Sequence, residues 1–315
     1  MNQFEYIGQT DLLNYVEFID ESLLNFYSSN SISQAVELIS QSQQRKKLPI
    51  LLLDSNPINV DHYIDKLYEY FTPTDFFVLT ADSATQIQKS NVAHWPFCLI
   101  MQQQSNQNYQ QVFQKQYRIG CLSRVPRYHR LCLLQAIKPY VTSDDVVVAN
   151  KFDANIPTEV KQDSKMISYY QHLPYTNNKD YLDLNLDIDY CSVNHPAYRA
   201  CINITNESYY KNDLIFLSEK TWKAYASGCL VINYGSQLVP AQLKKYGIEI
   251  WEEYDKCLEF TDKIRQITEL FQRSDIKELY QTNLKLIKHN QELVTSLQFA
   301  KKLSQPAIEK IQQLL

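Results

Sequence analysis

The stretch Phe216-Leu-Ser-Glu-Lys-Thr-Trp-Lys-Ala-Tyr-Ala-Ser-Gly-Cys-Leu-Val-Ile-Asn-Tyr-Gly235 predicts a helix that leads directly into a buried strand. Ser218 is a good N-cap, and Glu219 follows it where an acidic side chain complements the helix dipole. Gly228 then ends the helix before an apolar run at residues 229–234. A helix followed by a continuous apolar strand is typical of a parallel α/β sheet.

Helices and apolar strands alternate on both sides of this stretch. We expect strands at residues 48–53, 75–80, 117–122, 145–149, 200–205 and 229–234, and helices at 31–44, 59–71, 130–138 and 219–227. From residue 255 onward apolar side chains recur at helical spacing. The chain is therefore expected to be an α/β protein with parallel sheets and C-terminal helices.

The length of 315 residues suggests two domains of ordinary size. After a third apolar stretch at 95–101, residues 102–116 are rich in Gln and Asn without clear periodicity, and we interpret them as a linker. We expect a first α/β domain at 1–113, a second at 114–295 and a final helix at 296–315.

Composition excludes several classes of protein. The chain is 44% hydrophobic and 12% aromatic with a net charge of −4, which argues against disorder. No apolar run reaches the ~18 residues of a membrane span, and the N-terminus lacks the pattern of a secretory signal. We therefore expect a cytoplasmic protein without a transmembrane segment. Its seven scattered cysteines, an odd number without a C-x-x-C pair, are expected to be reduced.

The five glycines form neither a G-x-G-x-x-G motif nor a P-loop, which argues against a typical dinucleotide dehydrogenase or Walker NTPase. A different anion site is suggested by the helix start at Ser218. A helix N-terminus beside a lysine suits a phosphate, and a carboxylate there can accept the paired hydroxyls of a ribose. The structural alternative is that Ser218 caps the helix, Glu219 complements its dipole, and Lys220 and Lys223 are solvated.

A second strand-to-helix turn, Ser123-Arg-Val-Pro-Arg-Tyr-His-Arg130, carries three arginines and one histidine. Cations oppose the dipole at a helix N-terminus, so these arginines call for another anion, although surface charge is the alternative. His129 among arginines would be held neutral, which favours a structural role over that of a catalytic base. After a third strand, Glu207 either binds a sugar hydroxyl or merely ends the strand.

These strand ends resemble the donor-binding signature of the α-1,3-fucosyltransferases, a glycosyltransferase family of GT-B fold. In that family F-E-N-S is followed by Y-x-T-E-K-L, a glycine and an apolar strand. Here the sequence reads Thr205-Asn-Glu-Ser208, Phe216-Leu-Ser-Glu-Lys-Thr221 and Gly228-Cys-Leu-Val-Ile232. The turn Ser123-x6-Arg130 resembles the family's S-N-P…R turn. It looks closer still to the L-N-R-x-P-R-x-H-R turn of glycosyltransferase-like proteins of phages, giant viruses and bacteria. The resemblance covers about residues 117–235.

The resemblance implies two Rossmann-like lobes whose parallel sheets face a central cleft, with the last helix crossing back to the first lobe. Glu219 would bind the ribose of a nucleotide sugar, and Lys220 with Arg130 its diphosphate. The full set of implied donor-binding residues is Ser123, Arg124, Arg127, Arg130, Asn206, Glu207, Ser218, Glu219, Lys220, Thr221 and Lys223. Phe216 replaces the family's tyrosine, and the altered F-E-N-S order leaves the choice between Asn206 and Glu207, and the sugar, open.

In such a site, Arg, Lys and helix N–H groups stabilise the departing diphosphate, so no metal or other cofactor is required. Inverting transfer also needs a carboxylate or histidine facing the acceptor hydroxyl. Candidates in the first lobe are Asp54, Asp82 and His94, for each of which turn capping is the alternative. The D-x-D spacing at residues 187–189 lies in a strictly alternating segment, which a half-exposed strand explains without a metal.

The sequence thus predicts a metal-independent glycosyltransferase that moves a hexosyl, fucosyl or pentosyl group from a nucleoside-diphosphate sugar. Its acceptor would be a surface glycan or, if the chain comes from a phage, a modified DNA base, against which the net charge of −4 weighs mildly. The alternatives are a non-catalytic nucleotide- or sugar-binding protein and an interaction scaffold of the same fold. Fold-level resemblance does not separate the three.

Overall fold

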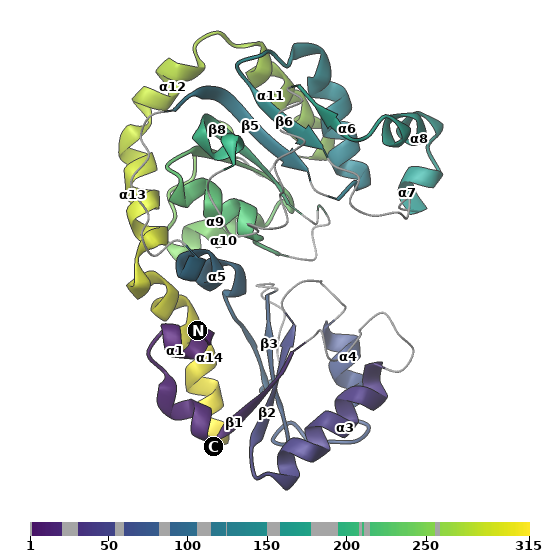
Figure 1. The fold of residues 1–315 in the computed structure, drawn as a ribbon, viewed down its shortest axis with the longest axis vertical. Helices are drawn as coiled ribbons and strands as arrows, with labels where there is room; N and C mark the ends of the chain where they lie inside the picture. Colours follow the sequence, from purple (N-terminus) through teal and green to yellow (C-terminus); the bar gives the residue numbers. More distant parts are fainter. Residues whose placement is uncertain are drawn as a thin grey trace. The chain divides into compact units, whose positions relative to one another are not determined.

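The structure, a computed structural model, describes residues 2–20, 31–53, 60–81, 89–105, 115–123, 125–149, 158–177, 195–207, 210, 215–255 and 259–315. It is an α/β protein with parallel sheets and C-terminal helices, which confirms the predicted class (Figure 1). Two compact units are present. The first comprises Met1–Gln104 with Ser296–Leu315, and the second comprises Ser105–Thr295.

The first unit contains a parallel sheet of order β1-β2-β3-β4, so strands follow one another in the sheet as they do in the chain. Its elements are α1 (Gln3–Tyr6), η1 (Thr10–Asn14), β1 (Val16–Asp20), α3 (Ser31–Gln44), β2 (Leu48–Leu53), α4 (Val60–Leu67), β3 (Phe77–Thr80), β4 (Val92–His94), α5 (Phe97–Ser105) and α14 (Leu297–Leu314). Apolar side chains of α3 and α4 pack on β2 and β3 in one core. Elsewhere in the unit Phe4 stacks on Trp95 at 4.6 Å.

The second unit contains a five-stranded sheet of order β7-β6-β5-β8-β9, parallel except for β7. Its strands are β5 (Tyr117–Ser123), β6 (Val146–Ala149), β7 (Tyr175–Thr176), β8 (Ala200–Asn206) and β9 (Leu230–Tyr234). Its helices are α6 (Tyr128–Ile137), η2 (Lys138–Tyr140), α7 (Thr158–Lys161), α8 (Ser164–Gln171), η4 (Pro196–Arg199), α9 (Glu219–Ala226), α10 (Val239–Tyr246), α11 (Phe260–Gln272), α12 (Ile276–Thr282) and α13 (Leu284–Thr295). β8 and β9 are buried along their whole length and on both faces, as a covered parallel sheet requires.

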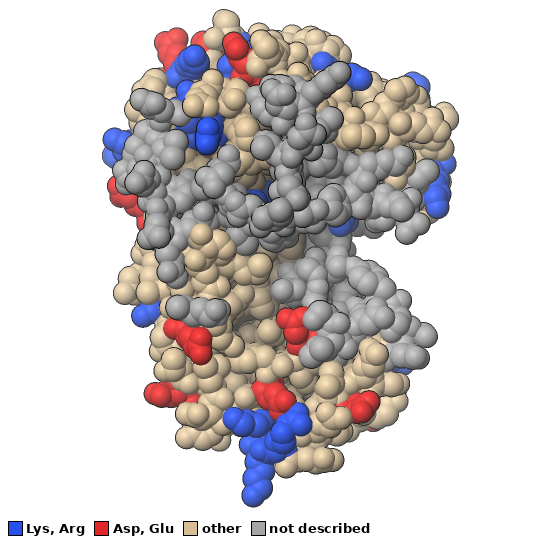
Figure 2. Space-filling view, viewed as in Figure 1, with Lys and Arg blue, Asp and Glu red and all other residues tan. Residues whose placement is uncertain are grey.

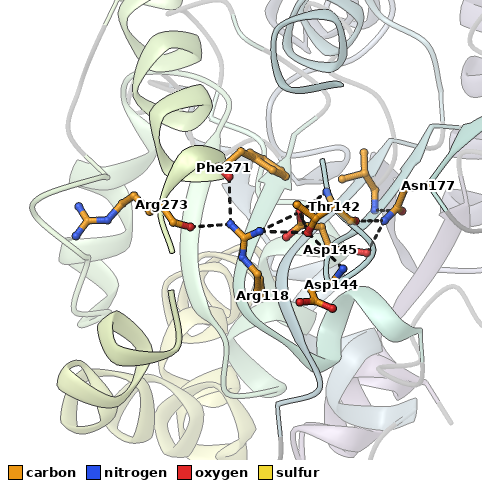
Figure 3. A network of polar contacts seen from close by, with 8 residues as sticks. Arg118, Thr142, Asp144, Asp145, Asn177, Phe271 and Arg273 are labelled. Carbon is orange, nitrogen blue, oxygen red and sulfur yellow. Dashed lines mark hydrogen bonds and ion pairs between the residues drawn. The ribbon is translucent and has the colours of Figure 1, made fainter. Parts of the chain in front are cut away.

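A polar network stabilises this sheet at its amino edge, the edge at which the parallel strands begin (Figure 3). Arg118 of β5 donates hydrogen bonds to the carbonyls of Phe271 and Arg273, at the end of α11, where helix carbonyls lack intrahelical partners. Its Nη1 lies 3.7 Å from the buried Asp145, whose Oδ2 also accepts hydrogen bonds from the amide and hydroxyl of Thr142. The network therefore fixes α11 against the starts of β5 and β6.

The predicted helix at 31–44 and strand at 48–53 have the bounds that the structure gives α3 and β2. The strands predicted at 117–122, 145–149, 200–205 and 229–234 are confirmed within one residue at each end, and α9 within one residue. The cysteines among the described residues, 98, 121, 132, 201 and 229, are free thiols, which confirms the expectation for these five.

Other expectations were wrong. The segment at residues 102–116 that was interpreted as a linker begins inside α5. Its Gln102 and Gln103 are buried in the first unit rather than solvated. The prediction also missed β1 and β4, and it started α6 two residues late, so His129 and Arg130 lie in the first helical turn. Within the described residues no helix is long and apolar enough to cross a membrane.

Candidate functional site

The strand order of the second sheet creates a topological switch point between β5 and β8. From β5 the chain continues through α6 to β6 on one side, and from β8 it continues through α9 to β9 on the other. Because right-handed crossovers leave these adjacent strands in opposite directions, α6 and α9 begin on opposite faces of the sheet. In open α/β sheets ligands bind at such a point, outside the carboxyl ends of the strands.

The two strand ends are joined across the switch point by buried side chains. Nδ2 of Asn206, the last residue of β8, donates to Oγ of Ser123, the last residue of β5, at 2.6 Å. Both residues were predicted to bind the sugar donor. The structure brings them together beside the start of α6, where Arg130 donates to the carbonyl of Asn206. Within the described part of the chain, Oδ1 of Asn206 is buried and accepts no hydrogen bond.

Arg130 in the first turn of α6 uses its guanidinium on the protein itself. It donates to the carbonyls of Val125, Asn206 and Glu207 at 2.9, 2.9 and 3.2 Å. The side chain is buried, which lowers its pKa to about 10 and leaves it charged at neutral pH. Arg130 therefore fixes the end of β8 against α6. The sequence predicted that Arg130 binds the diphosphate and did not predict this structural role.

His129 contributes a hydrogen-bond donor rather than a base. Its Nε2 lies 3.0 Å from the carbonyl of Glu207, which only accepts, so this nitrogen carries the proton. Burial, together with the charges of Arg130 and Arg127, lowers the pKa of His129 to about 3. The neutral histidine expected from the sequence is therefore found. Arg127 is the N-cap residue of α6, and its side chain makes no capping hydrogen bond.

The start of α9 is capped by two side chains. Ser218 is the N-cap, as predicted, and its Oγ accepts from the amide of Lys220. Both carboxylate oxygens of Glu207 lie 3.2 Å from the amide of Ser218, and Oε1 accepts from the hydroxyl of Thr221 at 2.6 Å. The expectation of open N–H groups for a phosphate is therefore wrong at Ser218, because the protein's own carboxylate occupies that position.

Glu219 and Lys220 are the next two residues, and they form an ion pair of 2.8 Å. Their side chains are 4% and 13% exposed, so Lys220 is not solvated as the structural alternative supposed. Lys223 lies one turn further along α9, buried, with Nζ 5.1 Å from the ring centre of Tyr198. Through that cation–π contact Lys223 interacts with Tyr198, which belongs to η4 rather than to the start of α9. Its predicted role in donor binding stays a prediction.

The remaining predicted residues belong to the first unit or lie outside the described residues. His94 is the last residue of β4 in the first unit. Asp54, Asp82, Arg124 and the D-x-D segment at 187–189 lie outside the described residues. Over the described ranges, no group of three or more His, Cys, Asp or Glu is placed to hold a metal ion.

Sequence reasoning missed a buried polar network behind α9. Oδ1 of Asn233 in β9 accepts from the hydroxyl of Thr205 at 3.0 Å and lies 3.2 Å from the hydroxyl oxygen of Thr221. The backbone and side-chain amides of Asn233 donate to the two carboxylate oxygens of Asp255. Lys263 of α11 pairs with Asp255 at 3.4 Å. Burial raises the pKa of Asp255, and Lys263 opposes that rise. An asparagine inside the apolar run 229–234 was the available signal for this network.

The chain was compared with protein-family models, with curated proteins and with solved structures, and none of the three comparisons finds a match. Arguments about function therefore rest on the site itself.

Proposed function

We propose that the protein is a glycosyltransferase that uses a nucleoside-diphosphate sugar bound at the switch point between β5 and β8. The observation that carries this proposal is the pairing of Glu219 and Lys220 at the start of α9, beside that switch point. The Glu219 carboxylate would accept the ribose hydroxyls, and the Lys220 ammonium would neutralise the diphosphate. The sequence resemblance supports the same two roles.

Chemically, such a site would work through charge. As the sugar leaves, negative charge develops on the diphosphate, and Lys220 with Arg127 would stabilise it from fixed positions. A neutral His129 with its Nε2 proton committed to a carbonyl supports a base located elsewhere. The GT-B arrangement is part of this proposal, with Asp54, Asp82 or His94 of the first unit as the group that activates the acceptor.

A glycan is the acceptor that we favour over DNA. On the face drawn in Figure 2, Lys and Arg of the described residues are interspersed with Asp and Glu. Together with the net charge of −4, this distribution supports an acceptor that does not depend on neutralising many phosphates.

The test is calorimetric titration with GDP, UDP, ADP, CDP and CMP, followed by an assay for nucleotide release from the matching nucleotide sugars. Glu219→Ala is compared with Glu252→Ala, a control at an exposed carboxylate of the same unit. We expect selective binding that Glu219→Ala abolishes and Glu252→Ala preserves, and nucleotide release that depends on an acceptor. Binding without release would identify a non-catalytic binding protein, and no binding at millimolar nucleotide would refute the proposal.

A further inference from the structure

Glu207 directly follows β8 and contacts three other elements of the second unit. Its amide donates to the carbonyl of Tyr234, at the end of β9, at 3.0 Å. Its carbonyl accepts from His129 Nε2 and Arg130 Nε, both in the first turn of α6. Its side chain binds the first turn of α9. This single residue therefore connects the helix starts on both sides of the switch point.

The side chain of Glu207 binds the residues on either side of Glu219 and Lys220, the two residues proposed to bind the ligand. Ser218 and Thr221, which the Glu207 carboxylate binds, flank Glu219 and Lys220 in the sequence. The carboxyl group of Glu207 adds hydrogen bonds at Ser218 and Thr221 to the serine cap, so the turn is restrained more than a serine cap alone would restrain it. Both carboxylate oxygens of Glu207 are engaged by Ser218 and Thr221, which directs this side chain at α9 rather than at a sugar hydroxyl.

We propose that Glu207 is a positioning residue, which fixes the first turn of α9 against the start of α6 and thereby places Glu219 and Lys220 relative to Arg127. The identity of the ligand in this inference rests on the proposed function. The restraint on α9 does not, because it follows from the contacts of Glu207 with Ser218 and Thr221.

Asp145 offers a matched control at the opposite edge of the same sheet. Like Glu207, it is a fully buried carboxylate that accepts hydrogen bonds from a backbone amide and from a threonine hydroxyl. It precedes β6, whereas Glu207 follows β8, and these parallel strands place the two carboxylates at opposite edges. Asp145→Asn therefore tests the loss of a buried carboxylate without touching α9.

The experiment compares Glu207→Gln and Asp145→Asn with the unsubstituted chain, and Thr221→Val with Thr221→Ser. Affinity is measured by titration with whichever of GDP, UDP, ADP and CDP binds the unsubstituted chain most tightly. Amide hydrogen exchange is followed in peptides that cover residues 216–226. We expect Glu207→Gln and Thr221→Val to weaken binding about tenfold, the effect of one lost hydrogen bond, and to speed this exchange. Thr221→Ser, which keeps the hydroxyl, and Asp145→Asn should keep the affinity within about twofold.

Three results would overturn the inference. The first is unchanged affinity and exchange in Glu207→Gln, the second is equal weakening of binding in Asp145→Asn, and the third is a Thr221→Ser variant as weak as Thr221→Val. If Glu207→Gln does not fold, the Thr221 pair decides. If the unsubstituted chain binds none of the diphosphates, the proposed function fails by itself. Exchange in residues 216–226 then decides whether Glu207 fixes the turn.

Discussion

Charged side chains at the switch point differ in the groups that they contact. Arg130 and Glu207 are buried and direct their polar groups at backbone groups of neighbouring elements. A buried polar or charged group without a partner is costly, so each needs these partners, and neither is spare for a substrate. Among the described residues predicted to bind the diphosphate, this leaves Lys220, which pairs with its neighbour Glu219, and Arg127.

Replacing Lys220 by alanine removes the cation that we expect to stabilise the leaving diphosphate. The loss should lower kcat/KM for the donor by about 10²–10³-fold, or roughly 2.7–4 kcal/mol in the barrier, as for one oxyanion donor. Steady-state kinetics measure the effect, with Lys244→Ala, at an exposed lysine of α10, as the control. Equal activities of the two variants would remove Lys220 from the mechanism.

The depressed pKa of His129 predicts a loss of stability in acid. The folded state binds the proton only near pH 3, whereas the unfolded chain binds it below about 6.5. The free energy of unfolding should therefore fall as the pH drops below 6.5, by up to about 1.4 kcal/mol per pH unit from this group. His129→Gln keeps a donor but does not titrate. In denaturant titrations it should lose less stability between pH 7 and pH 5 than His289→Gln, at an exposed histidine; equal losses would contradict the assignment.

At the scale of elements, the apolar pattern of the sequence predicted most strands of the second sheet. Elements with polar residues in their pattern were missed or misplaced. β6 is a continuous apolar run, and β5, β8 and β9 contain apolar stretches from which they were located. β1 was missed because Glu17 and Asp20 interrupt its pattern, and the start of α6 because Arg127 gives no side-chain cap. The side-chain partners of Glu207 lie 11 and 14 residues away in sequence, so its burial follows from tertiary structure that local pattern does not encode.

The network at the amino edge is expected to support stability without affecting binding. Arg118→Ala removes two hydrogen bonds from a cation to the end of α11 and the ion pair with Asp145. It should lower the free energy of unfolding by roughly 2–4 kcal/mol, because charged hydrogen bonds contribute about 1.5–3 kcal/mol each and part of the loss is recovered by water. Arg265→Ala, which breaks an exposed pair, should cost under about 0.5 kcal/mol.

Chemical denaturation measures both losses, and calorimetric titration measures nucleotide affinity. An Arg118→Ala variant as stable as Arg265→Ala would show that the network contributes little. A large change in nucleotide affinity would show that the two edges of the sheet are coupled.

At the scale of the whole molecule, the first unit is assembled from both ends of the chain. α14 follows the second unit in sequence and belongs to the first, where Lys310 donates to the carbonyl of Val92 in β4. The first sheet keeps its strands in chain order and therefore lacks a switch point among its described strands. The second sheet has one, and we therefore expect the nucleotide to bind to the second unit.

Ile311 tests the contribution of α14, because its side chain is fully buried in the first unit. Ile311→Ala should destabilise that unit by about 2–5 kcal/mol, the usual cost of truncating a buried aliphatic side chain. Hydrogen exchange resolved by peptide should report faster opening in residues 1–104 than in 115–295. The exposed Gln312→Ala is the control. Faster opening confined to the second unit would contradict the division into units.

Hydrogen exchange with and without the tightest-binding nucleotide locates the ligand on the chain and so tests whether the switch point binds it. We expect protection in peptides that cover residues 123–131 and 206–223, at the carboxyl edge of the second sheet, and none in peptides covering 142–146 at its amino edge. Nucleotide binding that left 123–131 and 206–223 unprotected would show that the ligand binds elsewhere.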